Sequence, residues 1–485
     1  MGSQTEAHIL RMGGLMAVWS QVKFSSLASD LRIDAEYYRP EVLHLRRAIN
    51  DGPWPVETTE QLSDSVINFG AYSLCNEIEF KEYEDRDNDG VMFITAQDIQ
   101  DGFIDYANAR WISLAQHDGL LWKSRINKRQ VLVAMAARLG HAAVYDGVTP
   151  LNSSQDIAKI TLRDPERVDP YYLAIYLNSA VGRGLLLASQ TGSVQQHTNL
   201  GRIKSIPVVI LPKQHQQLAA RKYREAVQKR QESAAIIASA ESILMEALGL
   251  EHIDASTPKC YFRRFQDLEA EARFDAEYFN PKYQRVIKRL REGGRTLADV
   301  APLSERVFSP SALAISPTFR YIEIGSLTGD GQAEFETLET AEAPSRATWL
   351  VKPGDIITST VRPIRRLSAM ISEEQDNCVC SSGFAVLTPK LGADGIEPEV
   401  LLTYLRLPVI CEVLDLHATA SMYPAIPVQR LMQIPIIVPD KVVRKQIVAK
   451  VQASIDARRE SVRLLNQAKK TVEDMIAGDS TGKGR

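Results

Sequence analysis

RIDAEYYRP at residues 32–40 and RFDAEYFNP at residues 273–281 decide the fold, because they are two copies of one motif in a single chain. Most of their positions are identical, and the second copy begins 241 residues after the first. Internal repeats have to be found before a fold is predicted, since a missed repeat gives the wrong architecture.

A second series of matches runs through the middle of each copy at an offset of 228 residues. In chain order the pairs are Phe93-Ile94 with Tyr321-Ile322, Ser153-Ser154 with Ser381-Ser382, Thr191-x-Ser193 with Thr419-x-Ser421, and Ile206-Pro207 with Ile434-Pro435. The order is the same in both halves, which is hard to obtain by chance. The chain of 485 residues is therefore predicted to contain one unit twice.

Each copy shows the same succession of predicted elements. A helix begins at Pro40 or Pro281, since proline suits the first helical position. Short strands follow, then a helix rich in leucine and tyrosine, then the β-branched runs IPVVILP and IPIIVP. Each copy ends in one long helix. We expect an α/β (α+β) fold class: two tandem domains joined by two long helices with pseudo-two-fold symmetry.

The two long helices carry apolar residues at alternating spacings of three and four, which is typical of a coiled coil. The predicted seam is Val227, Ala234, Ile237, Leu244 and Leu248 in the first helix, and Ile447, Val451, Leu465, Ala468 and Val472 in the second. At 1.5 Å per residue each helix is roughly 50 Å long. We expect the helices to pair antiparallel. The alternative interpretation is that each packs only on its own domain.

This arrangement resembles the specificity (S) subunit of type I restriction–modification systems. The resemblance rests on the D-A-E-Y-[YF]-x-P motif, the I-P-[VI]-x-[IV]-x-P strand and the order of domains and long helices over residues 22–477. It implies target recognition domains at 22–213 and 273–439, long helices at 214–250 and 440–477, and a linker at 251–272. Residues 1–21 form a leader that the resemblance does not explain, and 478–485 a flexible tail.

The same resemblance implies partners and a division of chemistry. The partners would be double-stranded DNA, two DNA-methyltransferase subunits and motor-nuclease subunits. This chain would hold no cofactor, while S-adenosylmethionine, ATP and magnesium would belong to the partners. The two domains would read unlike half-sites about one helical turn (about 10 bp) apart. The alternative function is a two-lobed scaffold that bridges protein partners without DNA.

Composition and motifs agree with a non-catalytic protein outside membranes. The chain has 57 basic and 60 acidic residues, and no apolar run of about 18 residues that would cross a bilayer. Five cysteines over this length make no disulfide framework. Asn280-Pro281-Lys282-Tyr283 only approximates a methyltransferase loop, and no nucleotide-binding or hydrolase motif follows a strand. We therefore expect a cytoplasmic subunit that is not an enzyme.

Basic and amide side chains in turns are the candidate DNA contacts, because arginine and lysine bind phosphate and guanine, and glutamine and asparagine pair with adenine. In the first copy they are Lys123, Arg125, Lys128, Arg129, Arg138, His141, Gln195, Gln196, His197 and Asn199. In the second they are Arg362, Arg365, Arg366, Ser421 and Tyr423. The alternative for each residue is an ordinary solvated surface.

Overall fold

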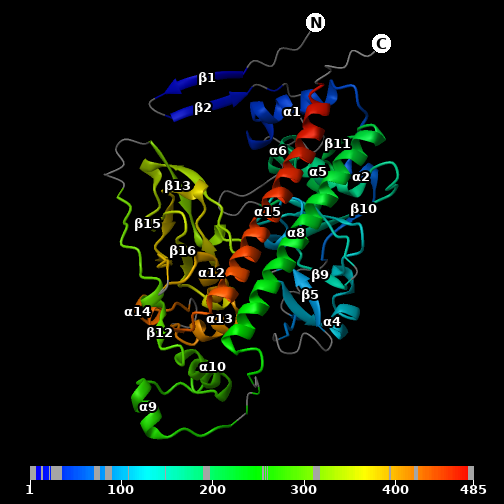
Figure 1. Cartoon of the computed structure of the whole chain (residues 1–485). Coiled ribbons are helices and arrows are strands. Elements are labelled where there is room, and N and C mark those ends of the chain that lie inside the picture. The colour runs from blue at the N-terminus through cyan, green and yellow to red at the C-terminus, as the bar shows by residue number, and fades with distance from the viewer. Residues whose placement is uncertain are drawn as a thin grey trace. The chain divides into compact units, whose positions relative to one another are not determined.

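The computed structural model describes residues 7–12, 15–20, 22, 35–69, 77–81, 90–106, 109–147, 149–188, 197–253, 256, 258, 260–309, 317–392, 395–419 and 424–478 (Figure 1). The chain divides into two compact units. Unit 1 comprises Met1–Arg230 and Arg458–Arg485, and unit 2 comprises Gln231–Ala457. Each unit therefore combines one copy of the repeat with half of each long helix.

Unit 1 is built on two small sheets. A four-stranded antiparallel sheet has the order β4 (Ser63–Ile67), β10 (Ile157–Leu162), β7 (Val131–Ala134), β8 (Ala142–Val144). A three-stranded sheet has the order β6 (Arg110–Ser113), β5 (Gly90–Ile94), β9 (Leu151–Ser153), in which β5 and β9 are parallel. A short ribbon joins β3 (Val56–Thr58) to β11 (Pro207–Val209).

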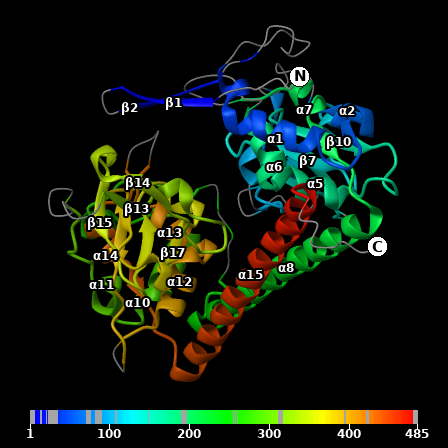
Figure 2. The same cartoon turned by 90° about the horizontal axis from the view of Figure 1, so that it is seen from above.

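The helices of unit 1 are α1 (Pro40–Asn50), α2 (Thr59–Leu62), α4 (Leu114–Asp118), α5 (Pro170–Asn178), α6 (Ala180–Ala188) and α7 (Leu200–Lys204). α5 packs on β7 and β8 of the larger sheet, whereas α4 lies beside β5 and β6 of the smaller one. Figure 2 shows α1, α5 and α6 gathered beside β7 and β10. Every residue of α5 is buried, and its tyrosines donate hydroxyl hydrogen bonds to backbone carbonyls or a carboxylate. This satisfies buried polar groups that would otherwise oppose folding.

Unit 2 repeats the plan. One sheet has the order β14 (Glu336–Glu339), β13 (Thr318–Ile322), β18 (Val379–Ser381), β15 (Ala347–Leu350), and β13 runs parallel to β18. The other has the order β17 (Ser368–Met370), β16 (Ile356–Ser359), β19 (Phe384–Leu387), and β12 (Arg295–Thr296) pairs with β20 (Pro435–Ile436). The helices are α9 (Phe265–Glu271), α10 (Pro281–Arg291), α11 (Leu297–Val300), α12 (Pro398–Arg406), α13 (Pro408–Asp415) and α14 (Val428–Met432).

The repeat predicted from the sequence is thus a repeat of structure. The offset of 228 residues carries β5 onto β13, β9 onto β18 and α5 onto α12, and each unit has one parallel strand pair in the same place. Sheets that are otherwise antiparallel, with helices grouped beside them, make this an α+β fold. The fold class expected from the sequence is confirmed.

The DAEY motif anchors the first helix of each copy. In unit 2, Tyr278 and Phe279 are buried, and the Asn280 side chain accepts a hydrogen bond from the Lys282 amide at the start of α10. Capping the first turn in this way stabilises a helix by about 1 kcal/mol. In unit 1, Tyr38 is buried directly before α1. In both units the motif therefore buries an aromatic residue just before the first helix and so fixes the start of that helix.

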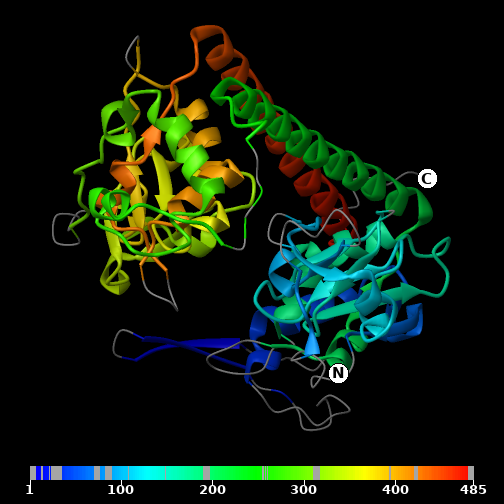
Figure 3. The same cartoon turned by 90° about the horizontal axis from the view of Figure 1, so that it is seen from below.

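The long helices α8 (Lys213–Leu248) and α15 (Lys441–Ile476) lie side by side and antiparallel (Figures 1 and 3). Within unit 1, the Ser461 hydroxyl donates to the carbonyl of Ala226 at 2.7 Å. Within unit 2, Ser233 and Ser454 bond reciprocally: each hydroxyl donates to the other's carbonyl, at 2.9 and 3.1 Å. The two helices therefore touch in each unit, as the seam predicts.

The seam itself differs from the sequence expectation in one helix. Leu244, Leu248, Ile447, Val451, Leu465, Ala468 and Val472 are buried, and Ile237 is partly buried. Ala234, however, is exposed and Val227 only half-buried, whereas Ala226, Ser233 and Ala240 are buried. The sequence pattern therefore predicts Val227 and Ala234 in the seam of α8, whereas the residues directly before them, Ala226 and Ser233, occupy it. Alanine and serine let the backbones approach closely, and the sequence pattern favoured the larger neighbour.

The alternative in which each helix packs on its own domain is also partly right. Tyr223 and Ala226 of α8 share a hydrophobic cluster with Leu465 and Ala468 of α15 and with the buried strands of unit 1. Leu244 and Leu248 share another with Ile447, Val451 and the interior of unit 2. The helices are therefore part of both cores. In the leader, β1 (Ala7–Met12) and β2 (Leu15–Ser20) form an antiparallel hairpin.

Candidate nucleic-acid interface

Two candidate segments that are distant in the sequence meet in unit 1. The turn between β7 and β8 spans residues 135–141, and the polar loop after α6 ends at residue 199. The Thr198 amide donates a hydrogen bond to the Met135 carbonyl at 2.9 Å. This bond holds the end of the polar loop, including the exposed His197, against the start of the turn.

Unit 2 makes the same connection. The Ile426 amide donates to the Thr360 carbonyl at 2.9 Å, and these residues are the counterparts of Thr198 and Met135. Here the contact is extended, because the Arg362 amide also donates to the Pro424 carbonyl at 2.7 Å. In both units the described end of a polar loop therefore lies against a basic turn. Gln195, Gln196, Ser421 and Tyr423 lie outside the described residues.

The backbone of both turns enters the left-handed region at non-glycine residues. Ala137 has φ 55° and Arg362 has φ 50°, at corresponding positions after β7 and β16. At the far end of each turn, Gly140 has φ 87° and Arg366 has φ 60°. A left-handed conformation costs a non-glycine residue roughly 1–2 kcal/mol. The same strained conformation occurs at corresponding positions of both units. There it determines the direction in which the side chains of the turn point.

Arg138 and His141 of the first turn lie in an electropositive environment. The His141 ring nitrogen Nε2 is 2.9 Å from an Arg183 guanidinium nitrogen of α6. Burial, together with the charge of Arg183, lowers the pKa of His141 to about 4. His141 is therefore neutral at physiological pH. Because the Arg183 guanidinium can only donate, Nε2 of His141 acts as the acceptor.

The three arginines of the second turn have different surroundings. Arg365 is exposed at the tip, and Arg362 is partly exposed. The Arg366 guanidinium, in contrast, donates to the Arg406 carbonyl at 2.7 Å and forms an ion pair with Glu241 of α8 at 2.5 Å. Arg366 thus fastens the turn to the interior of unit 2, which favours a structural role for it over a DNA contact.

The basic cluster of Lys123, Arg125, Lys128 and Arg129 is separated from the turn by the length of β7. The Arg129 amide donates to the Tyr145 carbonyl at the start of β7, whereas Arg138 lies beyond its end. Position by position, the four residues of the cluster correspond in unit 2 to Thr348, Leu350, Pro353 and Gly354, and Lys352 of the same segment pairs with Asp376 at 3.1 Å. The recurrence that supports a DNA role therefore applies to the turn and not to this cluster.

Other candidates serve the local structure. The Asn199 side chain accepts from the Arg202 amide at 3.0 Å and so caps α7. Arg125 donates to the His117 carbonyl and pairs with Asp118 at 2.6 Å. The 59% exposed side chain of Trp122, in the same segment, was missed by the sequence reasoning. Its signal was its position within the basic run LWKSRINKR.

A buried polar network in unit 1 was also missed. Lys159, in the middle of β10, is fully buried and donates to the Lys123 carbonyl at 2.7 Å and the Arg125 carbonyl at 3.2 Å. Burial lowers the pKa of Lys159 to about 8. The signal was a single lysine inside the apolar strand IAKITL, since a buried lysine is rare unless its ammonium group has partners.

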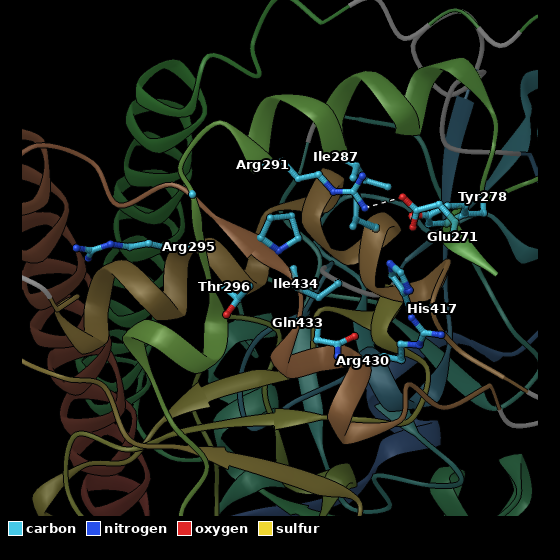
Figure 4. A pocket seen from close by; sticks show the side chains of 13 residues that line it. Glu271, Tyr278, Ile287, Arg291, Arg295, Thr296, His417, Arg430, Gln433 and Ile434 are labelled. Carbon is cyan, nitrogen blue, oxygen red and sulfur yellow. Dashed lines mark hydrogen bonds and ion pairs between the residues drawn. The ribbon is translucent and has the colours of Figure 1, made fainter. Parts of the chain in front are cut away.

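Unit 2 contains a hollow of about 300 Å³ lined by residues of α10, α13 and α14 (Figure 4). Its lining includes Arg291, Arg295 and Arg430 against a single carboxylate, Glu271, a formal charge of +2. Arg291 pairs with Glu271 at 2.9 Å, and the Tyr278 hydroxyl donates to the same carboxylate at 2.8 Å. Burial alone would raise the pKa of Glu271, but these bonds hold it below its ordinary value.

His417 is one of the residues that line this hollow. It follows α13 and precedes residues 420–423, while Arg430 lies in α14 beyond them. Burial, reinforced by the charge of Arg273 and Arg430, lowers the pKa of His417 to about 4. An Arg273 guanidinium nitrogen lies 3.2 Å from Nδ1, which leaves the proton of the neutral ring on Nε2. A neutral donor and a net positive lining suit an anion such as phosphate.

Among the described residues, no group of three or more His, Cys, Asp or Glu side chains is arranged to hold a metal ion. None of the helices there combines the length and the apolar character needed to cross a bilayer.

Comparison with known proteins finds similar structures but no similar sequence. No family model and no curated protein matches the chain. The type I restriction–modification S subunit from M. genitalium aligns over 88% of this chain and 96% of its own, at 14% identity and a TM-score of 0.36. The HsdS subunit from Thermoanaerobacter tengcongensis aligns over 88% and 97%, at 14% identity and a TM-score of 0.28. Such scores carry no assignment of function.

Proposed function

We propose that this chain is the DNA sequence-specificity subunit of a type I restriction–modification complex. Each unit would read one half of a bipartite site through its composite surface of turn and loop. The observation that carries the proposal is the repeated bond from Thr198 to Met135 and from Ile426 to Thr360, which joins a basic turn to a polar loop twice. Cations that position phosphate beside amides and hydroxyls that read base edges are what sequence recognition requires.

The half-sites would be unlike, because the surfaces differ. Unit 1 presents Arg138, His141 and His197, whereas unit 2 presents Arg362 and Arg365. Arg430 and the donor on His417 would hold a backbone phosphate beside the second loop. Of the basic cluster in unit 1, Lys123, Lys128 and Arg129 would contribute phosphate contacts specific to that half-site.

The chain would act with partners and not alone. It would dock two DNA-methyltransferase subunits, which would bind S-adenosylmethionine. Motor-nuclease subunits would supply ATP- and magnesium-dependent cleavage. Methyl transfer by the purified chain in the absence of these partners would contradict this assignment.

An exchange of one reader tests the proposal most directly. Residues 60–205 would be replaced by the corresponding segment of another type I specificity subunit, and the complex would select its target from a random pool of duplexes. One half of the selected site should change, while the other half and the spacer stay fixed. A change in both halves, or no sequence preference with either chain, would refute the proposal and favour a protein scaffold.

Single substitutions then distinguish phosphate from base contacts. If Arg362 contacts phosphate, Arg362→Ala should weaken all duplexes alike and reduce the slope of binding against salt by about 1. If it reads guanine, the loss should be about 1–3 kcal/mol and confined to one position of one half-site. Lys288→Ala, on the exposed face of α10, serves as the matched control and should change neither.

A further inference from the structure

The segment from Leu121 to Arg125 in unit 1 displays one large apolar side chain on a rigid base. Trp122 is 59% exposed, whereas Leu121 and Ser124 on either side are 1% exposed. An isolated exposed apolar residue needs no explanation when its segment is loosely held. Here its neighbours are fixed in the interior, so the exposure of the indole is a property of the fold.

Four carbonyls of this short segment accept hydrogen bonds from buried side chains. Asn152 donates to Leu121 at 3.0 Å, and Ser153 to Ser124 at 3.3 Å. Lys159 donates to Lys123 at 2.7 Å and to Arg125 at 3.2 Å. Asn152, Ser153 and Lys159 are all fully buried.

A buried ammonium group is a costly means of holding a surface segment, because desolvation opposes its charge. Unit 2 does not use it: Val386 and Val379 occupy the positions of Lys159 and Asn152, and Ala347 that of Trp122. The buried network and the exposed tryptophan therefore occur together in one unit and are absent together from the described part of the other. This association indicates that the network exists to present the tryptophan.

The surroundings of Trp122 are cationic. The Lys123 ammonium lies 5.2 Å from the centre of the indole ring. Lys128 and Arg129 are exposed a few residues further on. Arg125 pairs with Asp118, and Lys128 lies 3.8 Å from Asp146. An aromatic face among cations suits nucleic acid, since the ring contacts a base while the cations contact phosphates.

We propose that Trp122 inserts against a base of the bound DNA, with Lys123 on the neighbouring phosphate, and that Lys159 and Asn152 are positioning residues for this contact. This inference rests on the proposed function and adds an aromatic contact in the unit 1 half-site only. It assigns to unit 1 a local distortion of the duplex that unit 2 does not produce.

The test uses the full chain assembled with its methyltransferase partner and a duplex carrying the target selected by the unaltered complex. 2-Aminopurine is placed at successive positions of the unit 1 half-site. Binding should change its fluorescence at one position, and Trp122→Ala should abolish that change and weaken binding about tenfold. Trp122→Phe should retain most of both, and the salt dependence of Trp122→Ala should match that of the unaltered chain.

Two further variants separate presentation from contact. Lys123→Ala should reduce the salt slope by about 1 while keeping the fluorescence change. Lys159→Met should lose the fluorescence change although Trp122 is still present, with hydrogen exchange in residues 121–126 accelerated. A Lys159→Met complex that keeps the full signal would overturn the positioning role.

Failure of this inference can be told apart from failure of the proposed function. If the unaltered complex selects a sequence but Trp122→Ala binds it equally well with the same fluorescence, the aromatic contact is refuted and the function stands. If Trp122→Ala binds DNA normally but no longer assembles with the methyltransferase, Trp122 is a protein contact and the inference is equally overturned. If the unaltered complex has no sequence preference, the function itself is refuted.

Discussion

The two units share a backbone plan but have different interiors at one place. In unit 1, β9 and β10 bury Asn152 and Lys159, both 0% exposed. In unit 2, β18 and β19 place Val379 and Val386 at the same positions, and each joins a hydrophobic cluster. The same backbone arrangement therefore accommodates either a hydrogen-bonded polar network or an apolar core behind the same surface segment.

This difference decides what the surface displays. In unit 1 the polar network fixes the carbonyls of the segment, and Trp122 points outward. In unit 2 the corresponding segment carries Trp349 two positions later, and this side chain packs against the hydrophobic cluster. The two units therefore differ in the interior that supports a surface segment as well as in the segment itself.

The largest effect is expected when the polar network is broken. Asn152→Ala removes donors to the Leu121 carbonyl and the Ser124 hydroxyl and leaves His117 without its buried partner. Unsatisfied buried groups cost about 1–3 kcal/mol each, so we expect a loss of about 3 kcal/mol in the free energy of unfolding. Val379→Ala, at the corresponding position, should cost about 2 kcal/mol, because it removes two methyl groups from an apolar core. Urea denaturation measures both, and equal losses would contradict the comparison.

The second effect is a pH dependence that Lys159 contributes in unit 1. The folded pKa of Lys159 is about 8 and its ordinary value is 10.5, so the unfolded chain binds the extra proton between these values. Stability contributed by this group therefore rises with pH from about 8 to 10.5, by up to about 3 kcal/mol. Lys159→Met should abolish this rise relative to the unaltered chain, whereas Val386→Met should leave it intact. Parallel slopes for all three chains would contradict the assignment.

A third prediction concerns the strained turn. Gly140 in unit 1 and Arg366 in unit 2 both have positive φ, at 87° and 60°. Arg366→Ala loses the ion pair with Glu241 and keeps the strain, whereas Arg366→Gly loses the ion pair and relieves the strain. The glycine variant should therefore be about 1 kcal/mol more stable than the alanine variant. Thermal unfolding resolves the two, and an alanine variant at least as stable as the glycine one would contradict the strain.

The smallest effect is expected in the paired helices. Ser454→Ala removes a reciprocal bond with Ser233, and Ser461→Ala removes a single bond to the Ala226 carbonyl. We expect losses of about 1 kcal/mol and about 0.5 kcal/mol, since a typical hydrogen bond contributes about 1 kcal/mol net. Val462→Ala, on the exposed face of α15, is the control. A larger loss at Ser461 than at Ser454 would reverse this comparison.

The sequence predicts the fold well because the repeat is written twice and helix patterns are local. The seam of α15 is correct at Ile447 and Val451 because large apolar residues mark it. The seam of α8 is shifted at Ala234 because close backbone approach selects small residues, which carry little hydrophobic signal. Of the candidate interface, the turns and loops could be named, but not that Thr198 meets Met135 or that Arg366 is held by Glu241, because both depend on tertiary contacts.

The contacts between the helices have a consequence for how such a chain evolves. Residue 233 of α8 corresponds to residue 461 of α15, and residue 226 to residue 454, so the contacts of 233 with 454 and of 226 with 461 are equivalent. In a symmetric dimer of identical chains one substitution changes both contacts at once. Fusion into one chain removes that coupling. Ala226 corresponds to Ser454, so the contact of 226 with 461 has one hydroxyl hydrogen bond, whereas that of 233 with 454 is reciprocal. Covalent duplication thus lets each half of a paired contact change independently of the other.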